Sequence, residues 1–217
     1  MILRIVCSLI CLLFVFSLNG FAQEVQTIID NVQRQYETTD DIRANFRQLS
    51  LIKSANQTKE SQGTVYFKKP GKMHWEYTKP EAQLLVSDGK TMWFYVVEDR
   101  QVIVQNAEEA YGSKTPITFL SGMGKLQNDF YIKLLPATEK AAAYKLELLP
   151  KQPQPDVAKL ILTVDPVSSR IVHTGVYDPY GNITDVYLQD IQTNTAPAEE
   201  LFRFKIPEGV EVIQQKP

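Results

Sequence analysis

The stretch from Val65 to Val97 reads VYFKKPGKMHWEYTKPEAQLLVSDGKTMWFYVV and decides the fold of the chain. Within it, the segment KMHWEY alternates strictly between polar and apolar side chains. Such a period of two predicts an extended strand with Met73, Trp75 and Tyr77 on one face. The opposite face carries Lys, His and Glu. One face of this strand is therefore expected to be buried and the other to meet water.

Turn signals bound this strand on both sides. Lys69-Pro70-Gly71 precedes it and Lys79-Pro80 follows it, and proline removes a ladder donor while glycine accepts positive φ. Further on, Asp88-Gly89 predicts a tight hairpin that joins residues 83–87 to residues 91–97. The stretch therefore predicts an antiparallel meander rich in aromatic side chains.

The same type of pattern recurs along most of the chain. Short turns separate the segments and favour antiparallel connections, so we expect a mainly β fold built on one strongly curved sheet or open barrel. In 41–53 the apolar phase slips by one residue, which predicts a bulge or a strand break. The remaining predicted strands are 63–68, 72–77, 83–87, 91–97, 101–105, 129–135, 144–149, 159–164, 171–178, 182–190 and 201–206.

Two helical segments are expected beside the sheet. Apolar residues recur at helical spacing from Val25 to Tyr36, and the polar side of this helix is mixed rather than basic. Packing against the sheet is therefore favoured over lying on a membrane. Thr115-Pro116 can begin a short helix that carries Ile117, Phe119 and Leu120. We expect this helix to cover the mouth of the curved sheet as a lid over a cavity.

The first 22 residues have the composition of a secretory signal. Arg4 precedes an apolar run over 5–18, and Gly20-Phe21-Ala22 offers small residues for cleavage. The run is shorter than the roughly 20 residues that span a bilayer. We therefore expect residues 1–22 to be removed and residues 23–217 to form a single soluble domain.

Both cysteines of the chain, Cys7 and Cys11, lie inside the predicted signal. The mature chain would then have no disulfide, no thiolate nucleophile, no cysteine metal site and no lipid anchor. A net charge of −2 gives no indication of nucleic-acid binding. His74 and His173 sit in ordinary strand patterns, so the sequence predicts neither an enzyme nor a metal or cofactor site.

Several quoted segments together resemble a known family, the periplasmic outer-membrane lipoprotein carriers called LolA. The longest of them is LVSDGKTMWFY from Leu85 to Tyr95. The others, in matching order, are Phe46-Arg47-Gln48, Gly63, Lys69-Pro70, Thr115-Pro116 with its apolar helix, and FKIPEGVEV at 204–212.

This resemblance implies an unclosed antiparallel β-barrel covered by short lid helices. It also implies a monomeric periplasmic protein that takes triacylated lipoproteins from an inner-membrane lipoprotein-releasing ABC transporter to an outer-membrane lipoprotein acceptor. Lys69 stands where the family has an arginine that locks the lid, and Met73 replaces a usual aromatic. The implied ligand-binding residues are Val65, Phe67, Met73, Trp75, Ile117, Phe119 and Leu120.

Three alternatives stay open on the residues themselves. The same apolar side chains could be plain core packing. A periplasmic adaptor would instead expose its aromatic face to another protein. The lipid-anchored acceptor of the same fold is a third possibility, against which the missing lipidation cysteine argues.

Overall fold

The computed structural model describes residues 23–110, 126–136 and 143–215. Its strands form a single 12-stranded sheet in the order β12-β6-β5-β4-β3-β2-β1-β11-β10-β9-β8-β7. All neighbours are antiparallel except β12 and β6, which run parallel. The strands are β1 (Asp41–Ile52), β2 (Gln57–Lys68), β3 (Lys72–Lys79), β4 (Gln83–Asp88), β5 (Thr91–Val96), β6 (Gln101–Asn106), β7 (Phe130–Leu134), β8 (Tyr144–Pro150), β9 (Lys159–Val164), β10 (Ile171–Tyr177), β11 (Ile183–Thr193) and β12 (Glu211–Gln214).

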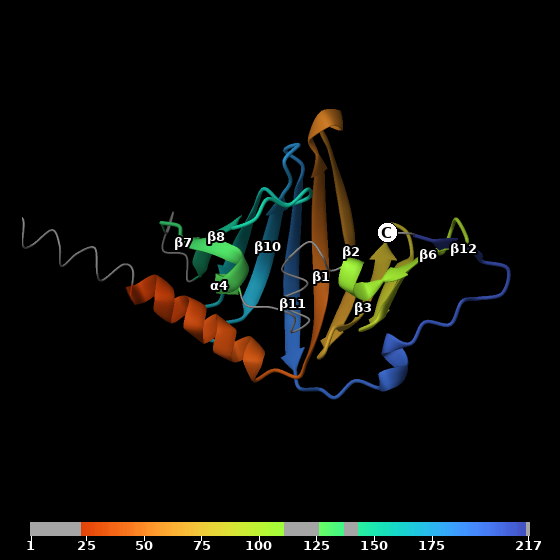
Figure 1. The fold of residues 1–217 in the computed structure, drawn as a ribbon, viewed down its shortest axis with the longest axis horizontal. Helices are drawn as coiled ribbons and strands as arrows, with labels where there is room; N and C mark the ends of the chain where they lie inside the picture. Colours follow the sequence, from red (N-terminus) through yellow and green to blue (C-terminus); the bar gives the residue numbers. More distant parts are fainter. Residues whose placement is uncertain (1–22, 111–125, 137–142, 216–217) are drawn as a thin grey trace, which may run out of the picture.

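The sheet curves strongly but does not close, because β7 and β12 stand at its two ends. Figure 1 shows the N-terminal helix, residues 23–37, lying across the β7–β10 half of the concave face. The short helices α2 (Ala107–Ala110) and α4 (Leu126–Asp129) also lie on this face. The predicted mainly β, unclosed antiparallel architecture is confirmed. The predicted lid helix beginning at Thr115-Pro116 lies outside the described residues.

β1 and β2 form a long hairpin that projects beyond the rest of the sheet (Figure 1). The two strands pair without interruption from Asp41 opposite Lys68 to Ile52 opposite Gln57. Of the two features predicted for this segment, a bulge or a strand break, the strand break is not found. A bulge does occur in the pairing of β1 with β11, but the extra residue is on β11, where Asp190 adopts φ 52°. The apolar phase slips because the later leucines of β1 occupy the outer face.

Gly63 lets β1, β2 and β3 approach closely at one point. It lies opposite Phe46 on β1, and the β2–β3 register shifts between Gln62 and Gly63. A Cβ at this position would lie 1.8 Å from the Glu76 carbonyl oxygen and 2.9 Å from Cε1 of Phe46. Only glycine fits here without displacing backbone.

The main hydrophobic core fills the space between the concave face and the helices. The N-terminal helix contributes Ile28, Val32 and Tyr36, which recur at the spacing that predicted the helix. Leu126 of α4 and Ala107 of α2 are buried in the same core. The sheet contributes the inward residues Ile42, Ala44, Phe46, Val65, Phe67, Met73, Trp75, Met92, Phe130, Leu146, Leu148, Leu160, Leu162, Val164 and Ile171.

A C-terminal strap, residues 194–210, packs on the outer face of the sheet through Leu201 and Phe204 before β12 pairs with β6. Figure 1 shows it running from the lower end of β11 along the lower right of the molecule to β12. The strand predicted at 201–206 is wrong: the strap holds the 3₁₀ helix η2 (Glu199–Phe202) and continues without joining a ladder. Phe202 is buried and Phe204 lies against Trp93, with ring centroids 6.3 Å apart. The apolar alternation of this segment therefore reflects packing on the outer face, where Val86 and Val102 are also buried.

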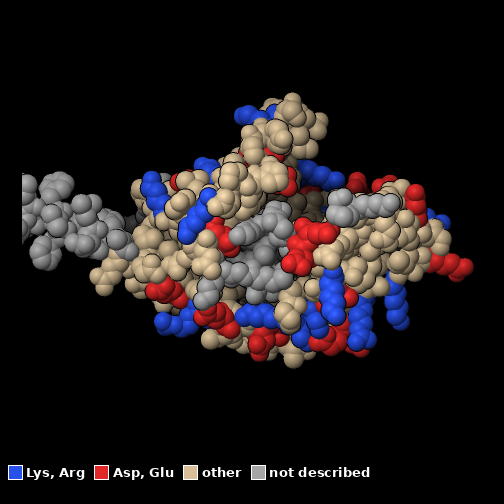
Figure 2. Space-filling model, in the orientation of Figure 1, with Lys and Arg blue, Asp and Glu red and all other residues tan. Residues whose placement is uncertain are grey.

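On the face that Figure 2 shows, acidic and basic side chains are mixed and do not form separate patches. Acidic and basic side chains are interspersed around the concave side, and the described residues form no continuous patch of one sign there. Across the described ranges, no helix is both long and apolar enough to cross a membrane.

Candidate functional site

Four of the predicted ligand-binding residues lie together on the concave face of β2 and β3. Val65 is directly opposite Trp75, and Phe67 is directly opposite Met73. All four side chains are buried, and Trp75, the most exposed of them, has a relative exposure of 5%. The other three predicted residues, Ile117, Phe119 and Leu120, lie outside the described residues.

An aromatic cluster surrounds Trp75. The ring of Phe46 on β1 lies 4.8 Å from that of Trp75, and the ring of Phe67 lies 6.0 Å from it in an edge-on arrangement. Tyr77 completes the cluster with its ring 5.0 Å from Phe46. Tilted and edge-on pairs at these separations suit the charge distribution of aromatic rings. Phe46 was not among the predicted site residues, although its alternation with Ile42 and Ala44 already placed it on the inner face.

The indole nitrogen of Trp75 stands out within this apolar cluster. Its Nε1 is buried, and no acceptor for it is found in the part of the chain that the structure describes. A buried N–H without a partner costs about 1–3 kcal/mol relative to a satisfied one. The concave face therefore presents a hydrogen-bond donor among apolar side chains.

Tyr77 marks the polar rim of the same cluster. Its hydroxyl donates to the Gln48 side-chain oxygen at 3.1 Å. Burial raises the pKa of Tyr77 to about 12, against the opposing effect of that hydrogen bond. The hydroxyl is thus neutral throughout the physiological range and acts as a fixed dipole at the edge of the cluster.

Lys69, the predicted lid lock, lies at the turn between β2 and β3. Its ammonium donates to the carbonyl oxygens of Tyr36 and Glu37, the latter at 3.2 Å. These carbonyls belong to the last turn of the N-terminal helix, so Lys69 caps its C-terminal end. A cation at this end also complements the helix dipole. The described contacts of Lys69 therefore hold the N-terminal helix. Its predicted contacts with the lid fall on residues outside the described ranges.

Tyr36 anchors the same helix end to the other half of the sheet. Its hydroxyl oxygen accepts a hydrogen bond from the Ile171 amide of β10 at 3.1 Å. Burial raises the pKa of Tyr36 above its ordinary value. Through Lys69 and Tyr36, the end of the helix is tied both to the β2–β3 turn and to β10.

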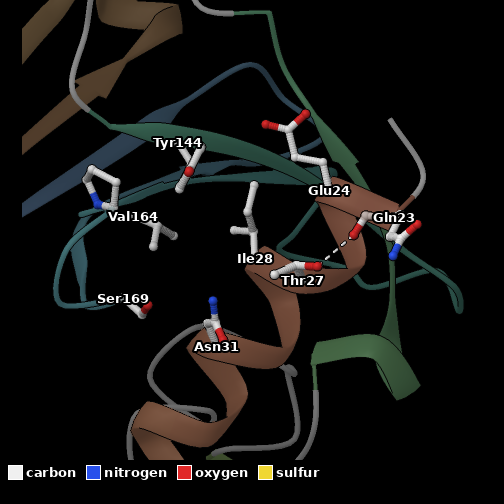
Figure 3. Close-up of a pocket in the computed structure, with 9 residues that line it drawn as sticks. Gln23, Glu24, Thr27, Ile28, Asn31, Tyr144, Val164 and Ser169 are labelled. Atoms are coloured by element: carbon white, nitrogen blue, oxygen red, sulfur yellow. Dashed lines mark hydrogen bonds between the residues drawn. The ribbon is translucent and has the colours of Figure 1, made fainter. Parts of the chain in front are cut away.

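A pocket of about 320 Å³ lies at the opposite, N-terminal end of this helix. Figure 3 shows Tyr144 and Val164 on the sheet side of the pocket and Ile28 on the helix side, with Ser169 and Asn31 lower in the view. The nine lining residues are Gln23, Glu24, Thr27, Ile28, Asn31, Tyr144, Val164, Pro166 and Ser169. No local pattern in the sequence indicates this pocket, because it joins segments more than 100 residues apart.

Charged contacts fasten the C-terminal strap to the outer face. Glu199 accepts from the ammonium groups of Lys68 and Lys72 at 2.6 and 2.5 Å. These hydrogen bonds lower the pKa of Glu199 to about 2. At the start of the strap, the buried carboxylate of Asp41 accepts from the backbone N–H of Thr195 at 2.7 Å and of Ala196 at 3.0 Å. No local pattern in the sequence links Glu199 to the distant Lys68 and Lys72, so these contacts were not predicted.

The two histidines also lie on the outer face. Nδ1 of His74 lies 2.8 Å from the Leu201 carbonyl of the strap. His173 lies between Asp185, at 2.7 Å, and the hydroxyl of Thr163, at 3.2 Å, and stacks on Tyr187. These contacts link β9, β10 and β11. Among the described residues, no group of three or more His, Cys, Asp or Glu side chains is placed to hold a metal ion.

The chain is similar to known proteins both in sequence and in fold. The family model for the outer membrane lipoprotein carrier protein LolA matches residues 37–205. The outer-membrane lipoprotein carrier protein of Methylococcus capsulatus is 30% identical over 198 residues, covering 91% of this chain and 93% of the relative. That of Legionella pneumophila strain Corby is 33% identical over 207 residues, covering 94% and 98%.

The solved structure of an uncharacterized conserved protein from Thermus thermophilus shares the fold. It superimposes with a TM-score of 0.56 at 15% identity, over 88% of this chain and 99% of that one. The family model spans well over half of the sequence and includes both the β2–β3 cluster and Lys69. The chain belongs to the LolA family of outer membrane lipoprotein carrier proteins.

Proposed function

We propose that this protein is a soluble periplasmic carrier that encloses the acyl chains of outer-membrane lipoproteins on the concave face of its sheet. It takes triacylated lipoproteins from an inner-membrane lipoprotein-releasing ABC transporter and delivers them to an outer-membrane acceptor. The names of the relatives support the carrier role. The observation that carries the proposal is the buried cluster on the concave face of β2 and β3.

The chemistry of that cluster suits acylated cargo. Val65, Phe67 and Met73 offer apolar contact, and Met73 adapts its shape easily because it is unbranched. The N–H of Trp75, which has no acceptor among the described residues, offers a donor to an ester or amide carbonyl at the head of an acyl chain. A ligand with both features would replace core contacts and also satisfy this donor.

Energetics restrict how such a carrier works. Burying a methylene group gains about 0.8 kcal/mol, so one chain of roughly 16 carbons gains ~12 kcal/mol relative to water. Several chains together would exceed the affinities that proteins reach. The free energy of the acyl chains in the carrier must therefore be compared with their free energy in the membrane or partner protein at each end of the route, not with that in water. Differences of a few kcal/mol between these states set the direction of transfer.

The adaptor alternative requires an exposed aromatic face. The aromatics that the sequence placed on β3 are instead inside the molecule, since Trp75 is 5% exposed. Burial of this kind supports a carrier over a flat protein-binding surface.

Purified mature protein tests the proposal directly. We expect it to take up an environment-sensitive apolar dye in its folded state and to release the dye when a triacylated lipopeptide is added. Mass spectrometry of a lipid extract should find acylated cargo in protein purified from the periplasm. Dye uptake that occurs only on denaturation would contradict the proposal.

A further inference from the structure

We propose that Gln23 is a modification site: once residues 1–22 have been removed, its side chain closes onto the new chain end and forms a pyroglutamate lactam. This inference goes beyond the proposed carrier function, and it rests on the expected cleavage after Ala22. Figure 1 shows the N-terminal helix beginning at one end of the molecule, and Gln23 is the first residue of that helix. Removal of the signal makes Gln23 the first residue of the chain.

The step needs only groups that Gln23 itself carries. Its free α-amino nitrogen attacks the side-chain carbonyl carbon Cδ, and the new N–Cδ bond closes the lactam ring. The Cδ–Nε2 bond breaks, the proton that the amine gives up passes to Nε2, and ammonia leaves. An α-amino group has a pKa of about 8, so roughly a tenth of it is in the reactive neutral form near pH 7.

The local structure leaves both reacting groups free. Gln23 is exposed, and its side-chain amide makes no hydrogen bond within the described ranges. The hydrogen bond drawn in Figure 3 runs from the Thr27 hydroxyl to the main-chain carbonyl of Gln23, at 2.8 Å. The first N–H groups of a helix have no acceptor within the helix, so the backbone nitrogen of residue 23 can react without loss of a helical hydrogen bond.

The helix favours the neutral product over the cationic chain end. Its macrodipole and unpaired N–H groups give the first turn a partial positive charge, which disfavours an ammonium group there. The adjacent acidic side chain, Glu24, is exposed, so water weakens its attraction for the ammonium. Cyclisation removes the positive charge and leaves a neutral ring at the pocket that Gln23 lines together with Ile28 and Tyr144.

The lactam also protects the start of the helix. Aminopeptidases bind a free α-amine, and exposed chain ends are preferred sites of proteolysis. Ile28, in the second turn of the helix, is buried in the main core with a relative exposure of 5%. Loss of the first residues would therefore expose the core that the helix covers.

The test is the mass of the N-terminal peptide of protein isolated from the periplasm after expression of the full chain. We expect this peptide to begin at residue 23 and to be lighter than the unmodified peptide by the mass of one ammonia molecule. Gln23→Asn is the matched control, because it keeps the amide but can close only to a smaller, strained ring, so its amine should stay free. A peptide that still carries an uncyclised Gln23 after prolonged incubation at neutral pH, or one that begins at another residue, would overturn the inference.

A broad-specificity aminopeptidase gives a second readout. It should shorten the Gln23→Asn variant from its first residue and leave the cyclised protein at full length. Shortening of both proteins, or of neither, would contradict the protection assigned to the lactam. Neither measurement involves a lipid, so a failure here is distinct from a failure of the proposed carrier function.

Discussion

The Lys69 ammonium donates to the main-chain carbonyl of Tyr36, so a residue between β2 and β3 caps the C-terminal end of the N-terminal helix. A second donation reaches the Glu37 carbonyl at 3.2 Å. The helix that covers half of the concave face is thus fastened at one end by a side chain that lies next to the cluster proposed to hold the ligand. Movement of that helix and loading of the cluster are expected to be coupled through Lys69.

Lys69→Leu should favour the open, loaded state and slow unloading. Hydrogen bonds to a charged group contribute roughly 1.5–3 kcal/mol, and the leucine removes both. Lys69→Arg should act in the opposite direction, because a guanidinium offers more donors in a fixed fork. The measurement is transfer of a labelled lipoprotein from loaded carrier to acceptor, with the exposed Lys90→Leu as control. Unchanged transfer in Lys69→Leu would remove Lys69 from the proposed lock.

Trp75 can be tested with the other tryptophan of the chain as its control. Trp75→Phe keeps an aromatic ring but removes the buried indole N–H, and should weaken lipopeptide binding several-fold, in line with one net hydrogen bond of ~1 kcal/mol. Trp93→Phe, on the outer face beside Phe204, should leave binding unchanged. Dye displacement measures both. A larger loss in Trp93→Phe would indicate that the ligand lies on the other face.

Trp75→Glu is the more severe change at the same position. It places a carboxylate among Phe46, Phe67 and Tyr77, where burying an unpaired charge costs several kcal/mol. Loading should be blocked, and circular dichroism establishes whether the fold persists. Normal loading by a folded variant would remove the β2–β3 cluster from the proposed cavity.

Acidification should loosen the C-terminal strap through Glu199. Its pKa is lowered to about 2 in the folded state from 4.5, so its ionised form stabilises the fold. The contribution is complete above about pH 4.5 and is lost as the pH falls toward 2. Glu199→Gln should remove this part of the acid dependence, while Glu200→Gln should retain it. Urea unfolding of the unaltered protein and of the two variants, at several pH values between about 6 and ~2, measures how the free energy of unfolding of each depends on pH. Identical pH profiles would contradict the strap assignment.

Gly63→Ala should destabilise the protein by more than about 3 kcal/mol, because the added Cβ would lie 1.8 Å from a backbone oxygen of Glu76. Gly175→Ala provides the comparison. Its nearest new contact is the side-chain oxygen of Asp185 at 3.0 Å, which can move, so a cost of ~1 kcal/mol or less is expected. Denaturant unfolding of both variants gives the two free energies. Equal costs would show that close packing at Gly63 is not the cause.

Local patterns in the sequence predicted the meander well. Asp88-Gly89 forms the expected turn between β4 and β5, with Gly89 at φ 93° and the Asp88 carboxylate accepting from the Lys90 amide at 2.8 Å. Both features depend on adjacent residues, which is why the dipeptide was sufficient. The inner face of β3 was equally predictable, since alternation fixes which side chains share a face.

Contacts between distant segments could not be predicted in this way. The alternation at 201–206 has the same period whether its phenylalanines face a ladder neighbour or pack on the outer face of a complete sheet. The pattern alone therefore predicts a strand where the structure has part of the strap. Glu199 became important only because Lys68 and Lys72 lie on β2 and β3 beneath it. The pocket beside Ile28 likewise depends on how the N-terminal helix packs against strands that are distant in the sequence, which local periodicity does not determine.

The separation of β7 from β12 has a mechanical consequence. In a closed barrel, strand number and shear fix the diameter, so the circumference cannot grow without breaking a row of hydrogen bonds. The described strands form no such ring. A few degrees of added twist at each strand pair can therefore widen the concave face while every ladder stays intact. We therefore expect the capacity of the proposed carrier to be elastic. The same set of strands should then hold cargo with different numbers or lengths of acyl chains.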